Sequence, residues 1–417
     1  MNPTIKARIE SIRRGEVPEG YKRTKIGIVP NEWITNVTLK SICTINPKTE
    51  QLPDEFVYID LESVVEGMLV CKKIMEKSNA PSRAQRVLQA NDVIYQMVRP
   101  YQRNNYLFCH ESKSYKYVAS TGYAQLRAKC YAFLYYLINS DYFCVQVLKK
   151  CTGSNYPAIN SEDLASISIT YPKKEAEQEK IAEILAGQDR VIALKEKLLA
   201  EKQKQKKYLM QQLLTGKKRL PGFSGEWIES RLGDLFRERV ETNCAELRLL
   251  AITSGQGVIP RDELELKDNS SEDKSKYKKI CVGDIGYNTM RMWQGVSAFS
   301  NYEGIVSPAY TILMPNSEID AKFFAYLFKL PSIIFLFYRY SQGLVDDTRN
   351  LKYENLKRIR VLFPQDKKEQ SAIAGILLTA DKEIELLQKD IEQEKLKKKS
   401  LMQLLLTGIV RVDELVS

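Results

Sequence analysis

Histidine is almost absent from this chain, since His110 is the only one among 417 residues. Imidazole is a common metal ligand and the usual general base near neutral pH, so this scarcity argues against a histidine-rich metal site and leaves little room for histidine catalysis. The eight cysteines are scattered and form no Cys-x-x-Cys pair. In a chain of this length that pattern predicts reduced thiols and a cytoplasmic location.

Long apolar runs are also missing. The most apolar stretch, residues 323–338, is interrupted by Lys329 and Pro331 and is shorter than the roughly 18 apolar residues of a membrane span. We interpret it as a buried helix pair. Residues 1–14 are polar and basic, so we expect no secretory signal and no membrane partner.

Positive charge, in contrast, is abundant. The formal net charge is +11 and the sequence pI is about 9.0. Such a balance favours a polyanionic partner such as nucleic acid, although many basic proteins bind none. The length suggests two or three domains, and a hydrophobic content of 44% is enough for sizeable cores.

The chain contains one stretch twice. Residues 172–219 and 364–411 align at a constant offset of 192 without a gap. About 20 of roughly 48 aligned positions are identical, which indicates an internal repeat. The rest of the chain is best understood relative to these two copies.

Both copies are predicted to be long helices. Seam residues recur at alternating steps of three and four, the heptad pattern of a coiled coil: Leu185, Gln188, Ile192, Lys195, Leu199, Lys202, Lys206, Leu209 and Leu213 in the first copy, and Leu377, Ala380, Ile384, Leu387, Ile391, Glu394, Lys398, Leu401 and Leu405 in the second. Pro172 and Pro364 precede the helices, and Gly216 and Gly408 are the expected C-caps. About 40 helical residues would measure roughly 60 Å. Neither seam is wholly apolar, so each helix needs a partner. The best partner within the chain is the other copy, while a generic dimerisation coil is the alternative.

The flanking segments are predicted to be globular. We expect a helical stub at residues 1–17, a first globular domain at 18–172 and the first long helix at 173–216. A second globular domain follows at 217–364, then the second long helix at 365–408 and a tail at 409–417. In the first domain the predicted elements are strands at 56–59, 93–98 and 167–170, and one helix at 131–149 with the core face Phe133, Leu134, Leu137, Val145 and Leu148.

The two globular segments are related to each other. Asp92, Tyr95, Arg99 and Gln102 correspond to Asp284, Tyr287, Arg291 and Gln294 at the same offset, but most other positions differ. The predicted fold class is therefore mixed α/β: two related globular domains separated by two long helices that form an antiparallel coiled coil, with a pseudo-two-fold internal repeat. Such an arrangement suggests two related readers held at a fixed spacing.

Several motifs resemble the specificity (S) subunit of type I restriction–modification systems. They are GYKRTKIGIVPNEW at 20–33, RLPGFSGEW at 219–227, YNTMRMWQG at 287–295, VSPAY at 306–310, and the repeated EQ-x-x-IA-x-IL and LM-Q-x-LLTG segments. The resemblance covers essentially the whole chain. It implies two target recognition domains that each read one half of a split sequence in double-stranded DNA.

The resemblance also implies partners. The long helices would dock two modification (methyltransferase) subunits, and restriction subunits would complete the assembly. S-adenosylmethionine and ATP would be bound by those partners, so no cofactor, metal or catalytic residue is expected here. Consistently, the sequence has neither an Asn-Pro-Pro-Phe-like adenine-methylation motif nor a G-x-x-x-x-G-K-[ST] phosphate loop. The alternatives are a self-contained DNA methyltransferase or nuclease, and a coiled-coil adaptor that binds no DNA.

Base edges in the major groove are read best by Arg, Gln, Asn and Ser, whereas phosphate contacts fix the register. Residues of these types gather in loops of the first domain, with Tyr101 and Tyr156 beside them: Arg83, Arg99, Tyr101, Gln102, Arg103, Asn104, Asn105, Ser154, Asn155 and Tyr156. Ser82, Gln85 and Arg86 are weaker candidates beside Arg83. The second domain offers a corresponding set: Ser254, Gln256, Asn288, Arg291, Trp293, Gln294, Ser341, Gln342, Arg349 and Asn350, with Thr348 nearby.

Two lysine runs lie within the predicted helices, at 202–207 and 395–399. Such runs are usually a solvated face. Lys204 and Lys206 are nevertheless predicted to neutralise phosphates of spacer DNA, so that replacing them should weaken binding to all sequences alike.

Overall fold

The computed structural model describes residues 3–24, 27–48, 50–109, 115–253, 255, 257–264 and 273–412. Two compact units are present. The first unit comprises Met1–Lys195 and Asp390–Ser417, and the second comprises Glu196–Lys389. Each unit therefore contains one globular head and one part of each long helix.

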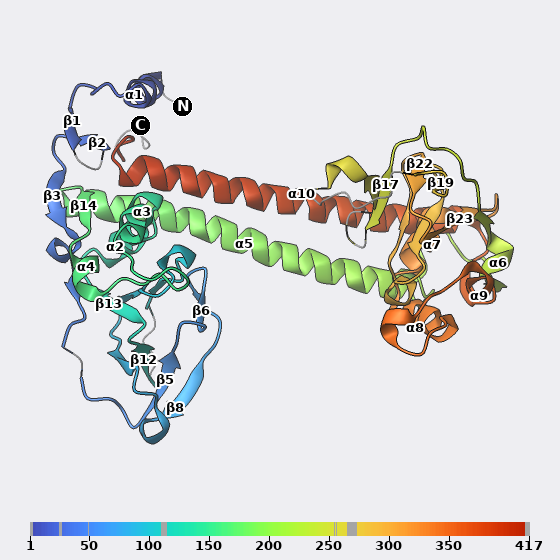
Figure 1. Ribbon diagram of the computed structural model, residues 1–417, viewed down its shortest axis with the longest axis horizontal. Coiled ribbons are helices and arrows are strands. Elements are labelled where there is room, and N and C mark those ends of the chain that lie inside the picture. The colour runs from blue at the N-terminus through green and yellow to red at the C-terminus, as the bar shows by residue number, and fades with distance from the viewer. Residues whose placement is uncertain are drawn as a thin grey trace. The chain divides into compact units, whose positions relative to one another are not determined.

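The two long helices are α5 (Glu175–Leu213) and α10 (Lys367–Leu406), as the repeat predicts. In the first unit, Lys195 pairs with Asp390 and Lys398 pairs with Asp189. Partner numbers therefore fall along α10 as they rise along α5, and the helices are antiparallel (Figure 1). Within the second unit, Lys202 pairs with Glu383 and Lys206 with Asp381 in the same sense.

The predicted seam is confirmed. Leu185, Ile192, Leu377 and Ile391 are buried, while the other seam positions are buried or partly buried. Polar seam residues are satisfied across the pair. Gln188 is one of them, and its side-chain amide donates to a carboxylate oxygen of α10 at 2.6 Å. The seam thus combines apolar burial with matched polar contacts, which fixes the register of the two helices.

Glu394 is the centre of the polar contacts in the first unit. Lys195 donates to its Oε1 at 2.8 Å and Gln188 to its Oε2 at 2.6 Å. Hydrogen bonds from Lys195 and then from Gln188 lower the pKa of Glu394 to about 2, from an ordinary value of 4.5.

This shift predicts acid sensitivity of the helix pair. A carboxylate with a lowered folded-state pKa contributes stability above its unfolded pKa, and that contribution is lost as the pH falls from about 4.5 to about 2. The Glu394→Gln variant should lose less stability over this window than the parent chain, because it has no charge to titrate. Thermal midpoints measured by helical circular dichroism at pH 5, 4, 3 and 2 test this. Equal pH slopes in both proteins would contradict it.

The repeated EQ-x-x-IA-x-IL motif now has a physical explanation. In both copies the glutamine side chain donates to a main-chain carbonyl of the proline that precedes the helix, Gln178 to Pro172 and Gln370 to Pro364, each at 2.9 Å. The apolar positions of the motif are buried in the heads: Ile181, Ala182 and Leu185 in one, Ile373, Ala374 and Leu377 in the other. The motif anchors the start of each helix in its own head.

The glutamate of the motif forms a clamp. In the first unit Arg411 donates to both oxygens of Glu177, at 2.9 and 3.1 Å. In the second unit Arg219 donates to both oxygens of Glu369, at 2.7 Å each. Each clamp joins the segment after one long helix to the first turn of the other. Bidentate guanidinium–carboxylate pairs give strong and directional contacts.

Both helices end shortly before the predicted C-cap glycines, at Leu213 and Leu406. Gly216 has φ +69° and Gly408 has φ +70°, the left-handed conformation that favours glycine. The amide of Lys218 donates to the carbonyl of Gln212 at 3.1 Å, which satisfies one of the last carbonyls of α5. A Cβ on Gly408 would lie 3.0 Å from Trp33 and 2.5 Å from Pro30, so these residues also require a small cap.

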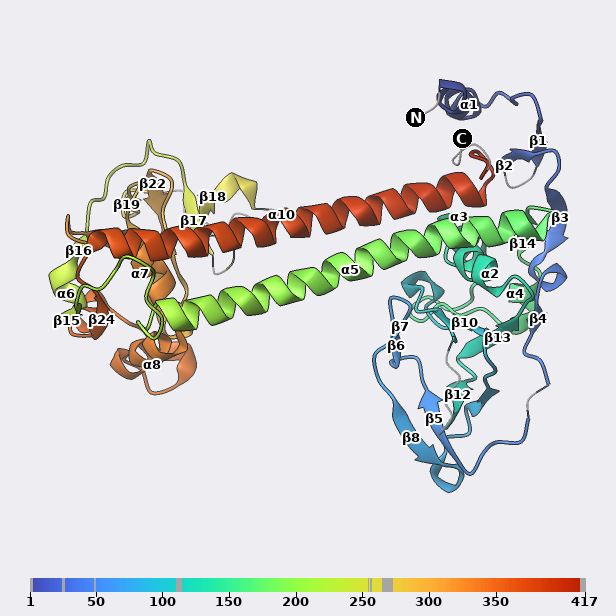
Figure 2. The ribbon, with the colours of Figure 1, turned by 180° about the vertical axis from the view of Figure 1, so that it is seen from behind.

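The described residues of the first head form small helices and five sheets. Its central sheet has the order β11-β10-β13-β4, and a second four-stranded sheet has the order β8-β5-β12-β9. The bounds of its elements are α1 (Pro3–Arg13), β1 (Tyr21–Thr24), β2 (Gly27–Pro30), β3 (Ile34–Thr38), η1 (Leu39–Ser41), β4 (Thr44–Ile45), β5 (Glu55–Ile59), β6 (Val64–Val65), β7 (Met68–Leu69), β8 (Lys73–Glu76), η2 (Lys77–Asn79), β9 (Ala84–Val87), β10 (Val93–Gln96), η3 (Pro100–Gln102), β11 (Tyr106–Leu107), β12 (Lys116–Ser120), β13 (Tyr123–Arg127), α2 (Tyr131–Ile138), α3 (Asp141–Leu148), α4 (Ser161–Ala165) and β14 (Ser168–Tyr171). The short helix α1 lies beside the end of α10 (Figure 2), where Arg8 donates to the carbonyl of Ile409 at 3.1 Å.

One predicted helix of this head is two. The stretch 131–149 is divided into α2 and α3 because Ser140 caps a new helix, accepting from the amide of Phe143 at 3.2 Å. Of the predicted core face, Phe133, Leu134 and Leu137 are buried, but Val145 and Leu148 are exposed. The prediction for these two residues is wrong because the break rotates the second helix relative to the first.

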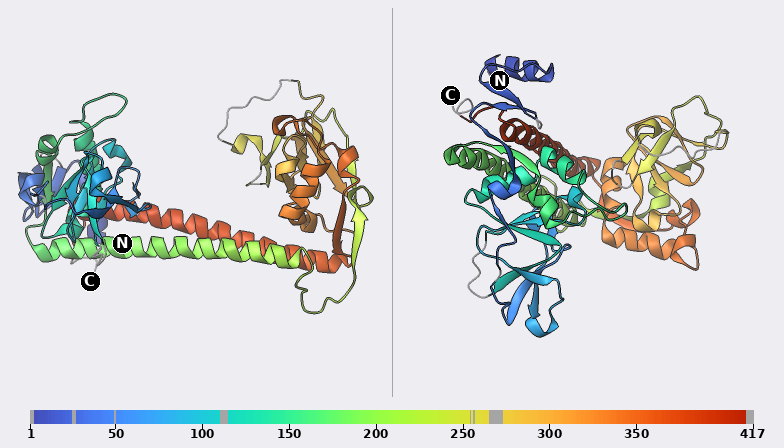
Figure 3. Two further views of the ribbon diagram at one scale, coloured as in Figure 1. Left: turned by 90° about the horizontal axis from the view of Figure 1, so that it is seen from below. Right: turned by 60° about the vertical axis from the view of Figure 1, so that its left-hand side comes forward.

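The second head has a central sheet of order β16-β23-β20-β21 and several two-stranded sheets. Its elements, drawn from yellow-green to orange in Figure 3, are β15 (Trp227–Arg231), α6 (Leu232–Leu235), β16 (Phe236–Arg239), β17 (Leu250–Thr253), β18 (Gly257–Pro260), η4 (Arg261–Glu263), β19 (Lys278–Ile280), β20 (Ile285–Asn288), η5 (Met292–Gln294), β21 (Ser297–Phe299), β22 (Gly304–Val306), β23 (Tyr310–Pro315), α7 (Ala321–Leu327), α8 (Pro331–Tyr340), η6 (Asp346–Thr348), α9 (Tyr353–Leu356) and β24 (Arg360–Pro364).

The apolar run of this head forms the expected helix pair. Phe323, Phe324, Phe328 and Phe337 of the run are fully buried in the core. Among the residues that the structure describes, no single helix is long and apolar enough to cross a membrane. Together α7 and α8 reach that length and composition, with a bend of 82° between them.

The heads share a buried acidic anchor. Asp92 and Asp284 each accept a main-chain amide three residues upstream, from Gln89 at 2.7 Å and from Cys281 at 2.8 Å. Asp92 is held by Arg127 of β13, whereas Asp284 is held by Arg239 of β16. The acid is matched between the heads, but its arginine comes from a different strand in each. The two heads therefore share the buried aspartate and its main-chain contact, but they neutralise its charge with arginines from different strands.

Candidate nucleic-acid interface

Two candidate loops of the first head meet at one place. Residues 97–99 and 152–159 are joined by main-chain hydrogen bonds, including Arg99 N–H to Pro157 at 2.7 Å and Ile159 N–H to Met97 at 3.0 Å. Residues Ser154, Asn155 and Tyr156 are exposed there. Segments about 50 positions apart in the sequence therefore present one continuous polar edge.

Arg99 and Tyr156 form a side-chain contact that joins the two loops of this edge. The Arg99 guanidinium carbon lies 4.3 Å from the centroid of the Tyr156 ring, in a cation–π contact. Arg99 has φ +54°, an uncommon conformation for a residue with a side chain. Tyr156 is 63% exposed. The pair holds a planar cation at the surface, a geometry suited to a phosphate or a guanine edge.

The 99–105 loop is ordered by its own hydrogen bonds. The buried Gln96 side chain accepts from the amide of Asn104 at 3.0 Å and donates to Gln102 at 2.9 Å. Gln102 and Tyr101 remain exposed, whereas Asn104 is partly buried and bonds the amide of Glu66. Gln96 is a residue that the sequence analysis missed. Its place inside a strand gave no signal of a role in the loop.

Two candidate residues of this loop are engaged within the protein. Asn105 is 1% exposed and its side-chain amide is used by Gln96 and Asn139, so it is engaged inside the head, and its contact with DNA stays a prediction. Arg103 donates to the carbonyl of Asn139 at 3.0 Å and to Asp141 at 2.7 Å. Its guanidinium is turned toward the protein, which points to a structural role.

The third candidate segment of the first head joins the same edge. The amide of Thr121 donates to the carbonyl of Arg83 at 2.8 Å, and Gly122 accepts from Met97 at 3.0 Å. Arg83, Ser82 and Gln85 are exposed, so their contact with DNA stays a prediction. Burial lowers the pKa of Arg86, whose Nε is buried without a hydrogen-bond acceptor among the described residues.

The second head repeats this geometry. The amide of Leu351 donates to Thr289 at 2.8 Å, as Ile159 does to Met97. The 288–297 loop and the 341–350 segment therefore meet as the two loops of the first head do. In the 288–297 loop Arg291 and Gln294 are exposed, Asn288 bonds the amide of Met290, and Trp293 packs edge-on against Tyr338.

The 341–350 segment is held by an arginine. Arg349 lies 4.0 Å above the Tyr338 ring and donates to Asp346 at 2.8 Å. Ser341 donates to the carbonyl of Phe337, and Gln342 and Asn350 pair through their main chains. Asn350 Oδ1 is buried and finds no donor among the described residues. Ser254 and Gln256 lie outside the described residues.

In each lysine run of the long helices some members form ion pairs with the other helix, whereas others are exposed. Lys206 forms an ion pair with Asp381, which also accepts from the Tyr326 hydroxyl at 2.6 Å. The first unit contains the matching set, in which Asp189 binds Lys398 and the Tyr136 hydroxyl at 2.6 and 2.8 Å. We call these sets the Tyr–Asp–Lys triads. They link each head to both long helices of its unit.

These contacts change the expectation for the two lysines. Lys204 is exposed and pairs only with the neighbouring Glu201 within the described part of the chain, whereas Lys206 is engaged between helices. Lys206→Ala should lower the stability of the second unit by about 0.5–1.5 kcal/mol, because the partly exposed Asp381 loses its cation. Lys204→Ala, the matched control, should change it by less than about 0.5 kcal/mol. Urea unfolding of both variants tests the difference, and equal midpoints would contradict it.

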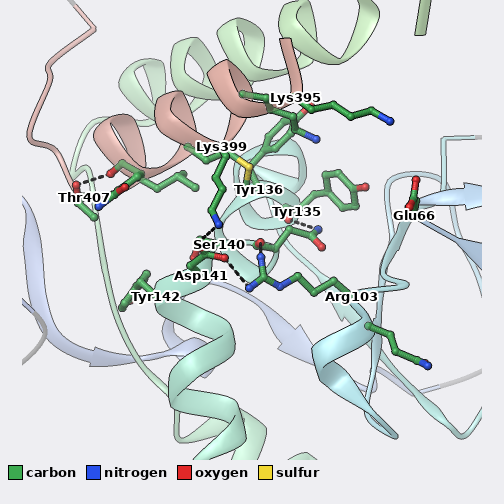
Figure 4. A pocket seen from close by; sticks show the side chains of 17 residues that line it. Glu66, Arg103, Tyr135, Tyr136, Ser140, Asp141, Tyr142, Lys395, Lys399 and Thr407 are labelled. Carbon is green, nitrogen blue, oxygen red and sulfur yellow. Dashed lines mark hydrogen bonds and ion pairs between the residues drawn. The ribbon is translucent and has the colours of Figure 1, made fainter. Parts of the chain in front are cut away.

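A cavity of about 510 Å³ lies in the first unit between α10 and the first head. Figure 4 shows that Arg103 and Lys399 both reach Asp141, Lys399 from the helix above it. The 99–105 loop is thus connected through one carboxylate to α10. Lys399 lies 3.5 Å from the Asp141 oxygen, and Arg103 lies 2.7 Å from the other oxygen.

Comparison with known proteins identifies the fold. Residues 30–203 match the family described as the type I restriction modification DNA specificity domain. The type I restriction enzyme MjaVIII specificity subunit of Methanocaldococcus jannaschii is 26% identical over 229 residues, which is 48% of this chain and 50% of that protein. The chain therefore matches about half the length of this curated relative.

Two solved structures share the architecture over nearly their whole length. One, from a study of complex assembly and conformational transition of the type I R-M system, has a TM-score of 0.60 at 21% identity, with 92% of this chain and 99% of that chain covered. The other is the type I restriction-modification system S subunit from M. genitalium, with a TM-score of 0.54 at 16% identity and coverages of 90% and 96%. At these identities the likeness establishes the fold.

Proposed function

We propose that the chain is a specificity subunit of a type I restriction–modification system and that it reads a bipartite DNA sequence, one half-site with each head. The match of residues 30–203 to the DNA specificity domain of that family and the shared fold support this proposal. The observation that carries this proposal is the pair of matched edges. Each head brings two polar loops together by equivalent main-chain bonds, Ile159 to Met97 and Leu351 to Thr289, yet the exposed side chains differ. One scaffold with two different surfaces suits two different half-sites.

The chain would act as a reader and a scaffold. Two modification subunits would dock on the paired long helices and supply S-adenosylmethionine and methyl transfer, while restriction subunits would supply ATP-dependent cleavage. The chain itself would contribute no catalytic residue, and the complex would work in the cytoplasm, where it meets the DNA. The net charge of +11 favours the first encounter with DNA.

Methylation mapping tests the proposal directly. The full chain is co-expressed with a modification subunit from the same system, and methylated adenines are located across the host genome by single-molecule sequencing. We expect methylation at one split motif with a constant spacer. Methylation by the purified chain alone, or no sequence preference in the complex, would overturn the proposal.

A further inference from the structure

In each head a buried or partly buried cation fastens the polar loop to the turn between two helices. In the second head Lys329, between α7 and α8, donates to the carbonyls of Gly295 and Ser297 at 2.7 and 2.5 Å. In the first head Arg103 donates in the opposite direction, from the loop to the carbonyl of Asn139 between α2 and α3. In both heads these hydrogen bonds join the polar loop to the turn between the two helices. The cation belongs to the turn in the second head and to the loop in the first.

The second link fixes the end of the loop that leads into β21. Gly295 closes η5 with φ +79°, and a Cβ there would lie 2.8 Å from Ile334. The buried Met292 anchors one side of the turn. Lys329 secures the other side by binding two carbonyls that flank residue 296. The exposed Gln294 lies between these anchors and the exposed Arg291 directly precedes Met292, so their positions depend on both.

A partly buried ammonium such as that of Lys329 is energetically unfavourable as an anchor for a turn. Burial, together with the nearby Lys206 ammonium, lowers the pKa of Lys329 to about 8. A partly buried amine whose acceptors are neutral carbonyls contributes less to stability than an apolar side chain of similar shape. Its value therefore lies in geometry, since an ammonium can bind two carbonyls at once.

We propose that Lys329 and Arg103 are positioning residues for sequence reading, each setting the placement of its own loop, 288–297 or 99–105. This inference rests on the proposed function. Neither side chain touches DNA. Each holds the side chains of its loop in one orientation relative to the base edges. Loss of the cation should therefore reduce discrimination between correct and incorrect bases in one half-site only.

A phosphate contact would behave differently. A lysine that neutralises a phosphate weakens binding to all sequences, and its removal reduces the salt slope by about one. A positioning residue leaves the salt slope unchanged and lowers only the preference for the correct bases. The two roles are therefore separable in one set of titrations.

The experiment uses the full chain in complex with its modification subunits and four duplexes: the target found by methylation mapping, the target with the first half-site changed, the target with the second changed, and both changed. Affinities are measured at four salt concentrations. For Lys329→Met we expect discrimination at the second half-site to fall about 10- to 100-fold, with discrimination at the first half-site and the salt slope unchanged. Arg103→Met should produce the reverse pattern.

Conservative variants and a control complete the design. Lys329→Arg and Arg103→Lys keep a cationic donor and should retain most of the discrimination. Lys357→Met removes a half-exposed lysine of the second head that pairs with Glu354, and it should behave as the parent chain. If Lys329→Met is unstable, Lys329→Gln, which keeps one donor, is measured in its place.

The outcomes distinguish this inference from the proposed function. Equal losses at both half-sites, a reduced salt slope, or unchanged discrimination in the Met variants would overturn the positioning role while the parent complex still reads its split target. A parent complex without sequence preference would overturn both.

Discussion

Replacing residues 18–171 by the corresponding segment of a relative with a different target should change one half of the recognised DNA sequence and leave the other half unaltered. The reason is that each head has its own core. The core that contains Phe133 and Ile169 belongs to the first unit, and the core that contains Phe324 and Phe363 belongs to the second. Loops of one head can therefore be exchanged without rearranging the other.

The exchange should also preserve the attachment of the new head. The helix residues that enter the first core, such as Ile181 and Leu405, lie outside the exchanged segment. They have identical counterparts in the repeat, Ile373 and Leu213. Methylation mapping of the hybrid is the measurement, and the reciprocal exchange of residues 217–363 is the control. A hybrid in which both half-sites change would refute the assignment of one half-site to each head.

Arg239→Met should destabilise the second unit by about 3–5 kcal/mol. Arg239 binds Asp284 through Nε at 2.8 Å, and only 15% and 3% of the two side chains are exposed. Without the guanidinium, the Asp284 carboxylate would remain buried with an uncompensated charge. Adding Asp284→Asn to this variant should recover part of the loss because it removes that charge.

Arg248→Met is the matched control in the same unit. Its ion pair with Asp262 leaves 50% and 69% of the side chains exposed, and such surface pairs contribute about 0–1 kcal/mol. Urea unfolding, combined with hydrogen exchange of peptides covering β16 and β20, reports on the second unit. If both variants unfold at the same urea concentration, the acidic anchor has no special importance.

The long helices were predictable because their signals are local and occur twice. Heptad spacing identified both seams, and the glycines after each LLT segment identified both ends. The reason for the repeated glutamate was not predictable. Glu177 and Glu369 are clamped by Arg411 and Arg219, which lie 234 and 150 positions away in the sequence.

The candidate loops were found by residue type, but composition does not reveal which way a side chain points. Asn105 and Tyr156 belong to equally polar segments, yet one is buried in a hydrogen-bond network and the other is largely exposed. The break at Ser140 was missed because the apolar residues on both sides of it suit one continuous helix. Lys329 interrupted an apolar run and was noted only as an obstacle to a membrane span.

The ion pairs between the antiparallel helices α5 and α10 restrict how this architecture can change during evolution. The boundary between the units falls after Lys195 in α5 and before Asp390 in α10, two positions that form an ion pair. An insertion at the boundary in one helix alone would shift the pairing required in one unit against that required in the other. Changes in length should therefore occur as compensating pairs of similar size in both helices, which makes new spacings rarer than new loop sequences.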